Sequence, residues 1–440
     1  MADLIVGVFI ILFFVMVLLL KIELFFILNL FFVAFMSALR LDPATSIVSI
    51  FGISLYAKDI FFLSQMLFLS VFFTQQFTIN PKFFYSKYFQ IPFFILCIVV
   101  LKVLFAFPTY GSIAFLDAKA HLFFFGNILF FSAYPLSHVR VLNIFKIIFY
   151  FSLIYSVIGV LRYTTILPSI YSNYLGSLSF ANDFNALRLF DRSDLEVLLI
   201  GSFYAFIFLL INFKHNLYRY LPIFTWLSLF ILFSKTRSMI IVFLFSIFYL
   251  LYIFKVFDYK KVMILFIAFS PVIFLFLTLI PIQSIGGEAF SYENLLGENS
   301  TFVFRNIVNL AYINYMDFQS YFFGMTLGDT PIVFPEYFFN QLQGGKVGLH
   351  NSYVELTYSF GVPFTLFLLY MIANVLKKLF LLKKDNLNNP IISLSIVSVV
   401  SYFIISSMWT LGQFSGIVFG LAIASSRFNS NENPLTNKSL

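Results

Sequence analysis

The residues best suited to chemistry lie in one short string, His350-Asn351-Ser352-Tyr353-Val354-Glu355. The string follows the longest polar interval of the chain, about 283–347, and precedes an apolar run at 362–376. Histidine exchanges protons near neutral pH, and a neighbouring amide and carboxylate are able to orient it. We therefore expect proton transfer where water meets lipid. Glu355 would either orient His350 or, as the preferred interpretation, cap the helix that follows.

Four arginines form a second group of candidate residues. They are Arg188, Arg192, Arg237 and Arg305. The arginine fork matches the oxygens of a diphosphate in geometry and charge, so these residues suit an anionic, diphosphate-linked substrate. The simpler alternatives are an interfacial anchor for Arg237, and for Arg188 an ion pair with Asp191 or Asp194.

Other polar residues near or within apolar runs receive structural interpretations. Lys102 lies inside the run at 88–107 and is expected to snorkel or to be paired. His121, His138 and His215 lie at the edges of predicted spans and are expected to be structural. The sequence contains no phosphate-binding glycine loop, no zinc-ligand spacing and no credible carboxylate pair, so we expect neither a metal nor a cofactor.

The elements that position these residues are membrane helices. The 440 residues are 61% hydrophobic and only 10% charged, whereas soluble domains carry about 25% charged residues. Apolar runs of about 20 residues recur, and that length crosses a bilayer core as a helix. The net charge of +8 is attributed to basic cytoplasmic loops rather than to nucleic-acid binding. Cys97 is the single cysteine, so no internal disulfide forms.

The predicted fold is an all-α polytopic membrane protein. Its thirteen apolar runs lie at about 4–20, 24–39, 58–77, 88–107, 121–137, 141–160, 194–212, 217–233, 238–257, 262–282, 353–376, 390–408 and 410–426. The first is expected to be a retained helix rather than a signal peptide. The first two are short and close together, so we expect about 12 crossings, with the topology of the N-terminal side left open.

Basic residues orient the predicted helices. Lysines crowd the connections at 377–384 and 255–261, and positive residues stay on the cytoplasmic side. The intervals at 161–193, 234–237 and 283–352 are then external. Within the last of these, Asn306–Met316 is predicted to form an amphipathic helix. Its apolar side would carry Ile307, Leu310, Ile313 and Tyr315.

Four regions follow from these patterns. We expect an N-terminal transmembrane bundle at 1–282, a large external loop at 283–352 and C-terminal transmembrane helices at 353–427. The polar residues at 428–440 are expected to form a disordered cytoplasmic tail.

The string from His350 to Glu355, followed by Gly361 and an apolar run, resembles the C-terminal motif of the O-antigen polymerase and ligase superfamily. The segment Ser234-Lys235-Thr236-Arg237-Ser238 is similar to that family's short arginine element at the outer end of a span. Arg305 and the glycine-containing segment at 323–328 resemble its loop arginine and the segment before the histidine. The resemblance covers about 190–426. Pro363 departs from it, because the family often has a small residue there.

The resemblance implies a membrane-embedded, GT-C-like glycosyltransferase that needs no metal and uses undecaprenyl-diphosphate-linked glycans as donor and acceptor. His350 would be the catalytic base. Arg237 and Arg305 would bind the diphosphate, and Arg188 and Arg192 match a more variable loop. Asn351 and Glu355 belong to the same substrate-binding set. The site would face the periplasm at the bacterial inner membrane, and a chain-length regulator protein is a possible partner.

Several functions remain open at this point. The preferred one is a Wzy-type O-antigen polymerase, which joins lipid-linked repeat units. An O-antigen ligase, which transfers the glycan to lipid A-core, shares the same motifs and differs in its acceptor. A flippase for lipid-linked oligosaccharide is a third possibility, although inverted repeats and charges in the middle of spans are not conspicuous here. A scaffold without catalytic activity is the fourth.

Overall fold

The computed structural model describes residues 48–50, 53–55, 66, 70–71, 73–74, 87–133, 136–164, 192–211, 213–233, 237–254, 309, 312–329, 351–385, 389–406 and 413–428. The predicted runs at 4–20, 24–39 and 262–282 lie outside these residues, as does the polar tail beyond Phe428. So do His350, Arg188 and Arg305.

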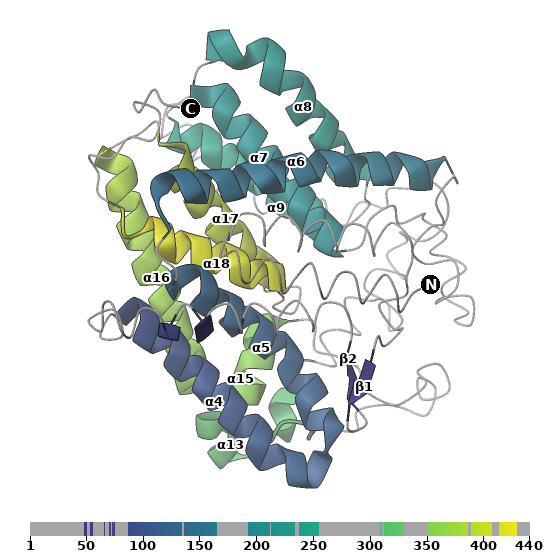
Figure 1. Ribbon diagram of the computed structural model, residues 1–440, viewed down its shortest axis with the longest axis vertical. Coiled ribbons are helices and arrows are strands. Elements are labelled where there is room, and N and C mark those ends of the chain that lie inside the picture. Colours follow the sequence, from purple (N-terminus) through teal and green to yellow (C-terminus); the bar gives the residue numbers. More distant parts are fainter. Residues whose placement is uncertain are drawn as a thin grey trace.

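Long helices coincide with most of the predicted runs that the structure describes. They are α4 (Lys87–Tyr110), α5 (Ser112–Ala133), α6 (His138–Tyr163), α7 (Arg192–Ile211), α8 (Phe213–Phe233), α9 (Arg237–Ile253), α16 (Val362–Asp385), α17 (Pro390–Ser406) and α18 (Gln413–Ser425). Two short helices, α13 (Phe318–Phe323) and α15 (Ser352–Phe360), precede α16. In Figure 1, α4, α5, α13 and α15 occupy the lower part of the molecule, and α7 and α8 the upper part.

Four of the described helical segments are long and apolar enough to cross a membrane. They are Phe89–Tyr110, Ile113–Ser132, His138–Leu161 and Val362–Lys384. Four shorter apolar segments accompany them: Leu195–Ile211, Met239–Ile253, Pro390–Ser406 and Phe414–Ser425. Length and composition thus indicate a helical membrane protein. The total of about 12 crossings and their orientation stay predictions.

Small residues allow the helices to pack closely. In α18, Gly416 lies against the backbone of Phe124 and Gly420 against Phe131, so a side chain at either glycine would separate α18 from α5. Glycines four residues apart are a common device for close helix contact in membranes. Buried serines serve α17 in a similar way, since the Ser401 and Ser246 hydroxyl oxygens are 2.6 Å apart and join α17 to α9.

The fold class is mostly, but not wholly, helical in the described residues. Strand β1 (Val48–Ile50) pairs antiparallel with β2 (Ile53–Leu55), and Ile50 lies opposite Ile53. The prediction of an all-α fold therefore holds for the described residues, apart from one two-stranded hairpin. The hairpin falls between two of the predicted runs, where the period-2 pattern of Val48, Ile50, Ile53 and Leu55 is too short to stand out.

The predicted span at 353–376 is wrong in its boundaries, because the chain breaks at Gly361. Helix α15 ends there and α16 begins at Val362. Gly361 has a φ of 85°, and its α-carbon lies so close to the carbonyl of Phe322 that a side chain would not fit. An apolar run carries no mark of such a break except the glycine itself. The segment long enough to cross a membrane therefore starts at Val362.

Candidate functional site

Helix α15 begins at Ser352, two residues after His350, and is capped by Asn351. The Asn351 side-chain oxygen accepts hydrogen bonds from the backbone N–H groups of Tyr353, at 2.9 Å, and Val354, at 3.3 Å. These are donors that the first turn of a helix leaves without intrahelical partners. The preferred interpretation of Glu355 as the cap is therefore wrong. Its carboxylate lies in the first turn of α15 and faces α5 instead.

The start of α15 is bonded to the end of α17. The Tyr353 hydroxyl donates to the backbone carbonyl of Phe403, at 2.6 Å. On the preceding residue of α17, the Tyr402 hydroxyl donates to the Glu196 carboxylate, at 3.1 Å. Glu196 is one turn into α7, which starts at Arg192. Two adjacent residues of α17 thus tie the start of α15 to the start of α7.

Arg192 and Arg237 lie at the same end of the helix bundle. Each is the first residue of its helix, α7 and α9 respectively. Only Asn212 separates α7 from α8, and only three residues separate α8 from α9. Helices joined by such short connections run antiparallel, so α7 and α9 start at the same end. That end is also where α15 starts and α17 stops.

Helix α15 carries a second polar group, which faces α5. The Nε2 atom of His121 lies 3.2 Å from the Ser359 hydroxyl oxygen and 3.8 Å from a carboxylate oxygen of Glu355. The expectation that His121 lies at a span edge is wrong, because α5 starts nine residues earlier, at Ser112, and His121 is almost wholly buried. The apolar run starts later than the helix, since Asp117 and Lys119 interrupt its first turns.

Lys102 joins α4 to the same group. Its ammonium donates to the backbone carbonyls of Met325, at 3.1 Å, and Ser359, at 2.5 Å, and lies 5.5 Å from the centre of the Phe360 ring. The prediction that Lys102 is paired is confirmed, although its partners are carbonyls rather than a carboxylate. Ser359 precedes the break in helical bonding at Gly361, and Met325 follows the break at Gly324. Their backbone carbonyls therefore accept hydrogen bonds from Lys102.

Buried tyrosines cover the remaining side of α15. The Tyr358 hydroxyl donates to the backbone carbonyl of Asp329, at 2.9 Å, and its ring packs edge-on against Tyr312. Burial, with added repulsion from the Asp117 and Glu355 carboxylates, raises the pKa of Tyr312 to about 12. Burial likewise raises the pKa of Tyr358. Both phenols therefore remain protonated, and hence able to donate, throughout the physiological range.

The amphipathic helix expected at Asn306–Met316 faces the opposite way in its described part. The structure buries Tyr312 and Met316 against Tyr358, whereas Tyr315 is exposed. The prediction had assigned Tyr315 to the apolar side. The pattern alone did not resolve this, because aromatic and aliphatic residues lie on both sides of the segment.

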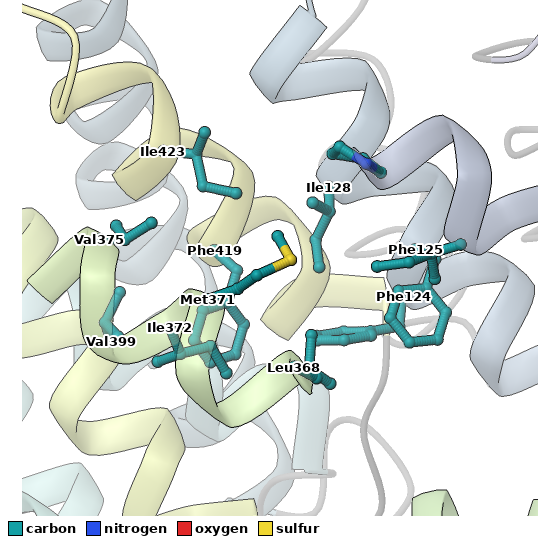
Figure 2. A pocket seen from close by; sticks show the side chains of 12 residues that line it. Phe124, Phe125, Ile128, Leu368, Met371, Ile372, Val375, Val399, Phe419 and Ile423 are labelled. Carbon is teal, nitrogen blue, oxygen red and sulfur yellow. The ribbon is translucent and has the colours of Figure 1, made fainter. Parts of the chain in front are cut away.

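The cavity in Figure 2 lies elsewhere and has a different chemistry. It holds about 20 Å³ and lies between α4, α5, α16, α17 and α18. Its lining is entirely apolar, with Ile128, Leu368, Met371 and Phe419 among the side chains that face it. A cavity without a polar group offers nothing to orient or polarise a substrate. The candidate site is therefore the polar end of the bundle around α15.

Comparisons with protein-family models and with curated proteins return no match to this chain. The geometry and the motif are therefore the whole basis of a functional assignment.

Sequence reasoning found the motif but not its supports. Glu196, Tyr402 and Ser359 were not singled out, although each lies in the network around α15. Glu196 carried a usable signal, because a carboxylate two residues into an apolar run at 194–212 marks a function or a buried partner. Tyr402 and Ser359 carried none, since tyrosine and serine are frequent throughout the chain.

The cap predicts a result for Asn351. We expect Asn351→Ala to destabilise the protein by about 1 kcal/mol, the usual cost of losing a cap, and to lower its thermal midpoint in detergent. Asn351→Asp retains the cap, so its midpoint should equal that of the parent. If activity falls in Asn351→Asp at unchanged stability, the side chain also contacts an anionic substrate. If Asn351→Ala is as stable as the parent, the capping role is wrong.

Proposed function

We propose that the protein is an O-antigen polymerase. It would join oligosaccharide repeat units carried on undecaprenyl diphosphate at the periplasmic face of the inner membrane. The observation that carries the proposal is the convergence of helix ends around α15. Helix α15, which follows His350 in the sequence, starts beside the end of α17, and α7 and α9 start with arginine at that same end.

The proposed reaction is a displacement at the anomeric carbon of the donor. His350 takes the proton of an acceptor sugar hydroxyl as its oxygen forms the new glycosidic bond. The bond between the anomeric carbon and the phosphate oxygen breaks, and its electron pair leaves with the diphosphate. Arg237 and Arg305, with Arg188 and Arg192, would stabilise the charge that builds on that group. The donor bond supplies the driving force, so no nucleotide is consumed.

Helix geometry supports this division of roles. Asn351 fixes the first turn of α15 through two backbone N–H groups, and Tyr353 ties that turn to Phe403. A base next to a capped and anchored helix would have little freedom to move, as a positioned proton acceptor requires. Helix α16, which follows α15, exposes Val362, Leu366 and Phe367 near its start, so a substrate held by a prenyl chain would reach the site without leaving the bilayer.

Loss of the gene separates the polymerase from the alternatives. In a strain that lacks the protein, a polymerase deficit leaves lipopolysaccharide with a single capped repeat unit. A ligase deficit leaves bare core, with polymer stranded on the lipid carrier. A flippase deficit leaves no repeat unit on the external side. We expect the first pattern, and restoration of the polymer by a plasmid copy. Either other pattern, or an unchanged polymer, would overturn the proposal.

The proposed role of Arg237 predicts a partial loss of turnover when lysine replaces it. Lysine retains the charge but lacks the fork that matches two phosphate oxygens. We expect Arg237→Lys to lower turnover about tenfold, less than the roughly 10²- to 10³-fold typical of removing a preorganised donor altogether. Arg219→Lys is the matched control, because Arg219 is exposed near the start of α8, at the other end of the bundle. Full activity in Arg237→Lys would mean that Arg237 only anchors α9.

A further inference from the structure

Helix α13 exposes an aromatic surface that the packing of the protein does not explain. Its six residues, Phe318–Phe323, include no buried side chain. Phe318 is 80% exposed and Phe323 is 70% exposed, with Phe322 half-exposed beside them. Phenylalanines grouped in this way on a protein surface mark a contact with a partner or a membrane.

The contacts of α13 place it beside the two most lipid-like helices. Its Phe322 backbone lies against Gly361, directly before the first turn of α16. Near that turn α16 exposes Val362, Leu366 and Phe367. The chain that leaves α13 contacts Lys102 of α4, and α4 exposes Leu101, Leu104 and Phe105 around that lysine. Figure 1 shows α13 next to the lower end of α4.

The depth of this contact follows from the position of Lys102 in α4. Lys102 lies eight residues before the end of α4 at Tyr110. At 1.5 Å per residue, Met325 therefore contacts α4 about 12 Å below its tip. Three residues later Gly328 lies against Tyr110 and Ala114, at the tip itself. The chain after α13 thus rises along the outer part of a helix that is long and apolar enough to span a membrane.

Backbone outside a helix at that depth needs hydrogen-bond partners from the protein, since lipid offers none. The structure supplies them. The Gly324 N–H donates to Ser320, at 2.7 Å, and the Met325 N–H donates to the carbonyl of Tyr358, at 2.6 Å. Lys102 donates to the Met325 carbonyl. This hydrogen bond explains why a lysine lies within a membrane-spanning helix, because its ammonium satisfies a backbone carbonyl that water does not reach.

The polar residues of α13 are confined to its start. Asp317 is the N-cap and accepts from the Ser320 N–H, at 2.7 Å. Hydrogen bonding with the Ser320 side chain, and then with its backbone, lowers the pKa of Asp317, so the carboxylate is charged. Gln319 is exposed on the same face as Phe323, one turn away. A charge at the start of the helix and phenylalanines along its exposed face are features of a helix that lies in a membrane interface.

We propose that α13 is an interfacial membrane anchor. Phe318, Phe322 and Phe323 insert at the boundary between phospholipid headgroups and acyl chains, and Asp317 faces water. The anchor holds the chain before α15 at the bilayer surface. The proposal concerns lipid contact alone, so it stands or fails independently of the glycosyl-transfer activity.

Single spin labels test the lipid contact. In a Cys97→Ser background, Phe318→Cys, Phe323→Cys and, as the reference, His215→Cys at an exposed position near the start of α8 are labelled singly, and the full-length protein is placed in phosphatidylcholine nanodiscs. Lipid-dissolved oxygen and a water-soluble nickel chelate then report the surroundings of each label. We expect positions 318 and 323 to favour oxygen over the chelate by at least about threefold relative to position 215, as burial in the apolar layer requires.

Two results would overturn the anchor. If the chelate reaches positions 318 and 323 as readily as position 215, the helix lies in water. If both reagents are excluded and the spectra show coupling between two labels, a second copy of the chain covers the surface instead.

A label-free measurement guards against a perturbing probe. The Phe323→Trp protein is expected to lose more fluorescence in brominated phosphatidylcholine than the parent with its Trp226 and Trp409. Equal fractional quenching of the two proteins would contradict the proposal.

Discussion

His350→Ala is expected to abolish glycan polymerisation while the protein stays folded. Removal of a positioned general base typically lowers a rate by about 10²- to 10⁴-fold, and a slow background from substrate binding remains. The measurement is the ladder of products formed by purified protein in nanodiscs that contain lipid-linked repeat units. Under single-turnover conditions the bond-forming step itself is observed, so slow product release cannot mask the loss.

The control for this prediction is another histidine. His215→Ala removes an exposed imidazole near the start of α8, at the end of the bundle away from α15. It should leave both the rate and the thermal midpoint unchanged. Because α15 is capped by Asn351 rather than by His350, the His350→Ala protein should also keep the parent midpoint. A wild-type rate in His350→Ala would remove the base assignment, and a lowered midpoint would show that the loss is structural.

Glu355 offers a way to separate orientation from proton transfer. Its carboxylate lies 3.8 Å from His121, so it links α15 to α5. Glu355→Gln retains the shape and removes the charge. A modest fall in turnover with unchanged substrate affinity is expected if Glu355 orients the start of α15 through this contact. A fall as large as that of His350→Ala would make Glu355 a second participant in proton transfer.

The helices were predictable because their signal is long and redundant. Runs such as 141–160 and 390–408 are apolar over many residues, and the structure begins α6 and α17 within three residues of those starts. Such a run tolerates several misread positions without changing the interpretation. The cap residue was misassigned because Asn351 and Glu355 both suit a helix start, and the choice depends on the backbone conformation of a single residue.

The three-dimensional neighbours of the motif were not predictable from its spacing. Lys102 of α4 and His121 of α5 come between 234 and 257 residues before the α15 residues that they contact. Glu196 of α7 comes 206 residues before its partner, Tyr402. Nothing in the sequence pairs them, because a helix of about 20 apolar residues has many equivalent ways to pack. Only charges within apolar runs mark positions that require a partner, and they do not say which partner.

The break at Gly361 leads to the largest expected effect on stability. We expect Gly361→Ala to destabilise the protein by about 3 kcal/mol or more. An alanine held at a φ of 85° costs about 1–3 kcal/mol by backbone strain alone. Its Cβ would also lie about 2.5 Å from the carbonyl carbon of Phe322. That atom belongs to backbone at the end of α13, which has no side-chain rotamer by which to move away.

Gly111 provides a control for Gly361, because it shares a positive φ but has open surroundings. Gly111 also has a positive φ, 58°, but an added Cβ would meet nothing within 4 Å. Gly111→Ala therefore measures the backbone strain without the collision, at about 1 kcal/mol. Thermal midpoints of both variants in the same detergent give the difference. If the two midpoints fall equally, the contact between α13 and Gly361 contributes nothing.

The collision at Gly361 has a consequence that strain alone would not produce. To relieve it, α13 must move away from the junction of α15 and α16, and Met325 then loses its place beside Lys102. The Gly361→Ala protein should therefore show a changed environment at a spin label on position 323, whereas Gly111→Ala should not. An unchanged label spectrum with a lowered midpoint would mean that α16 moves instead and α13 stays fixed to α4.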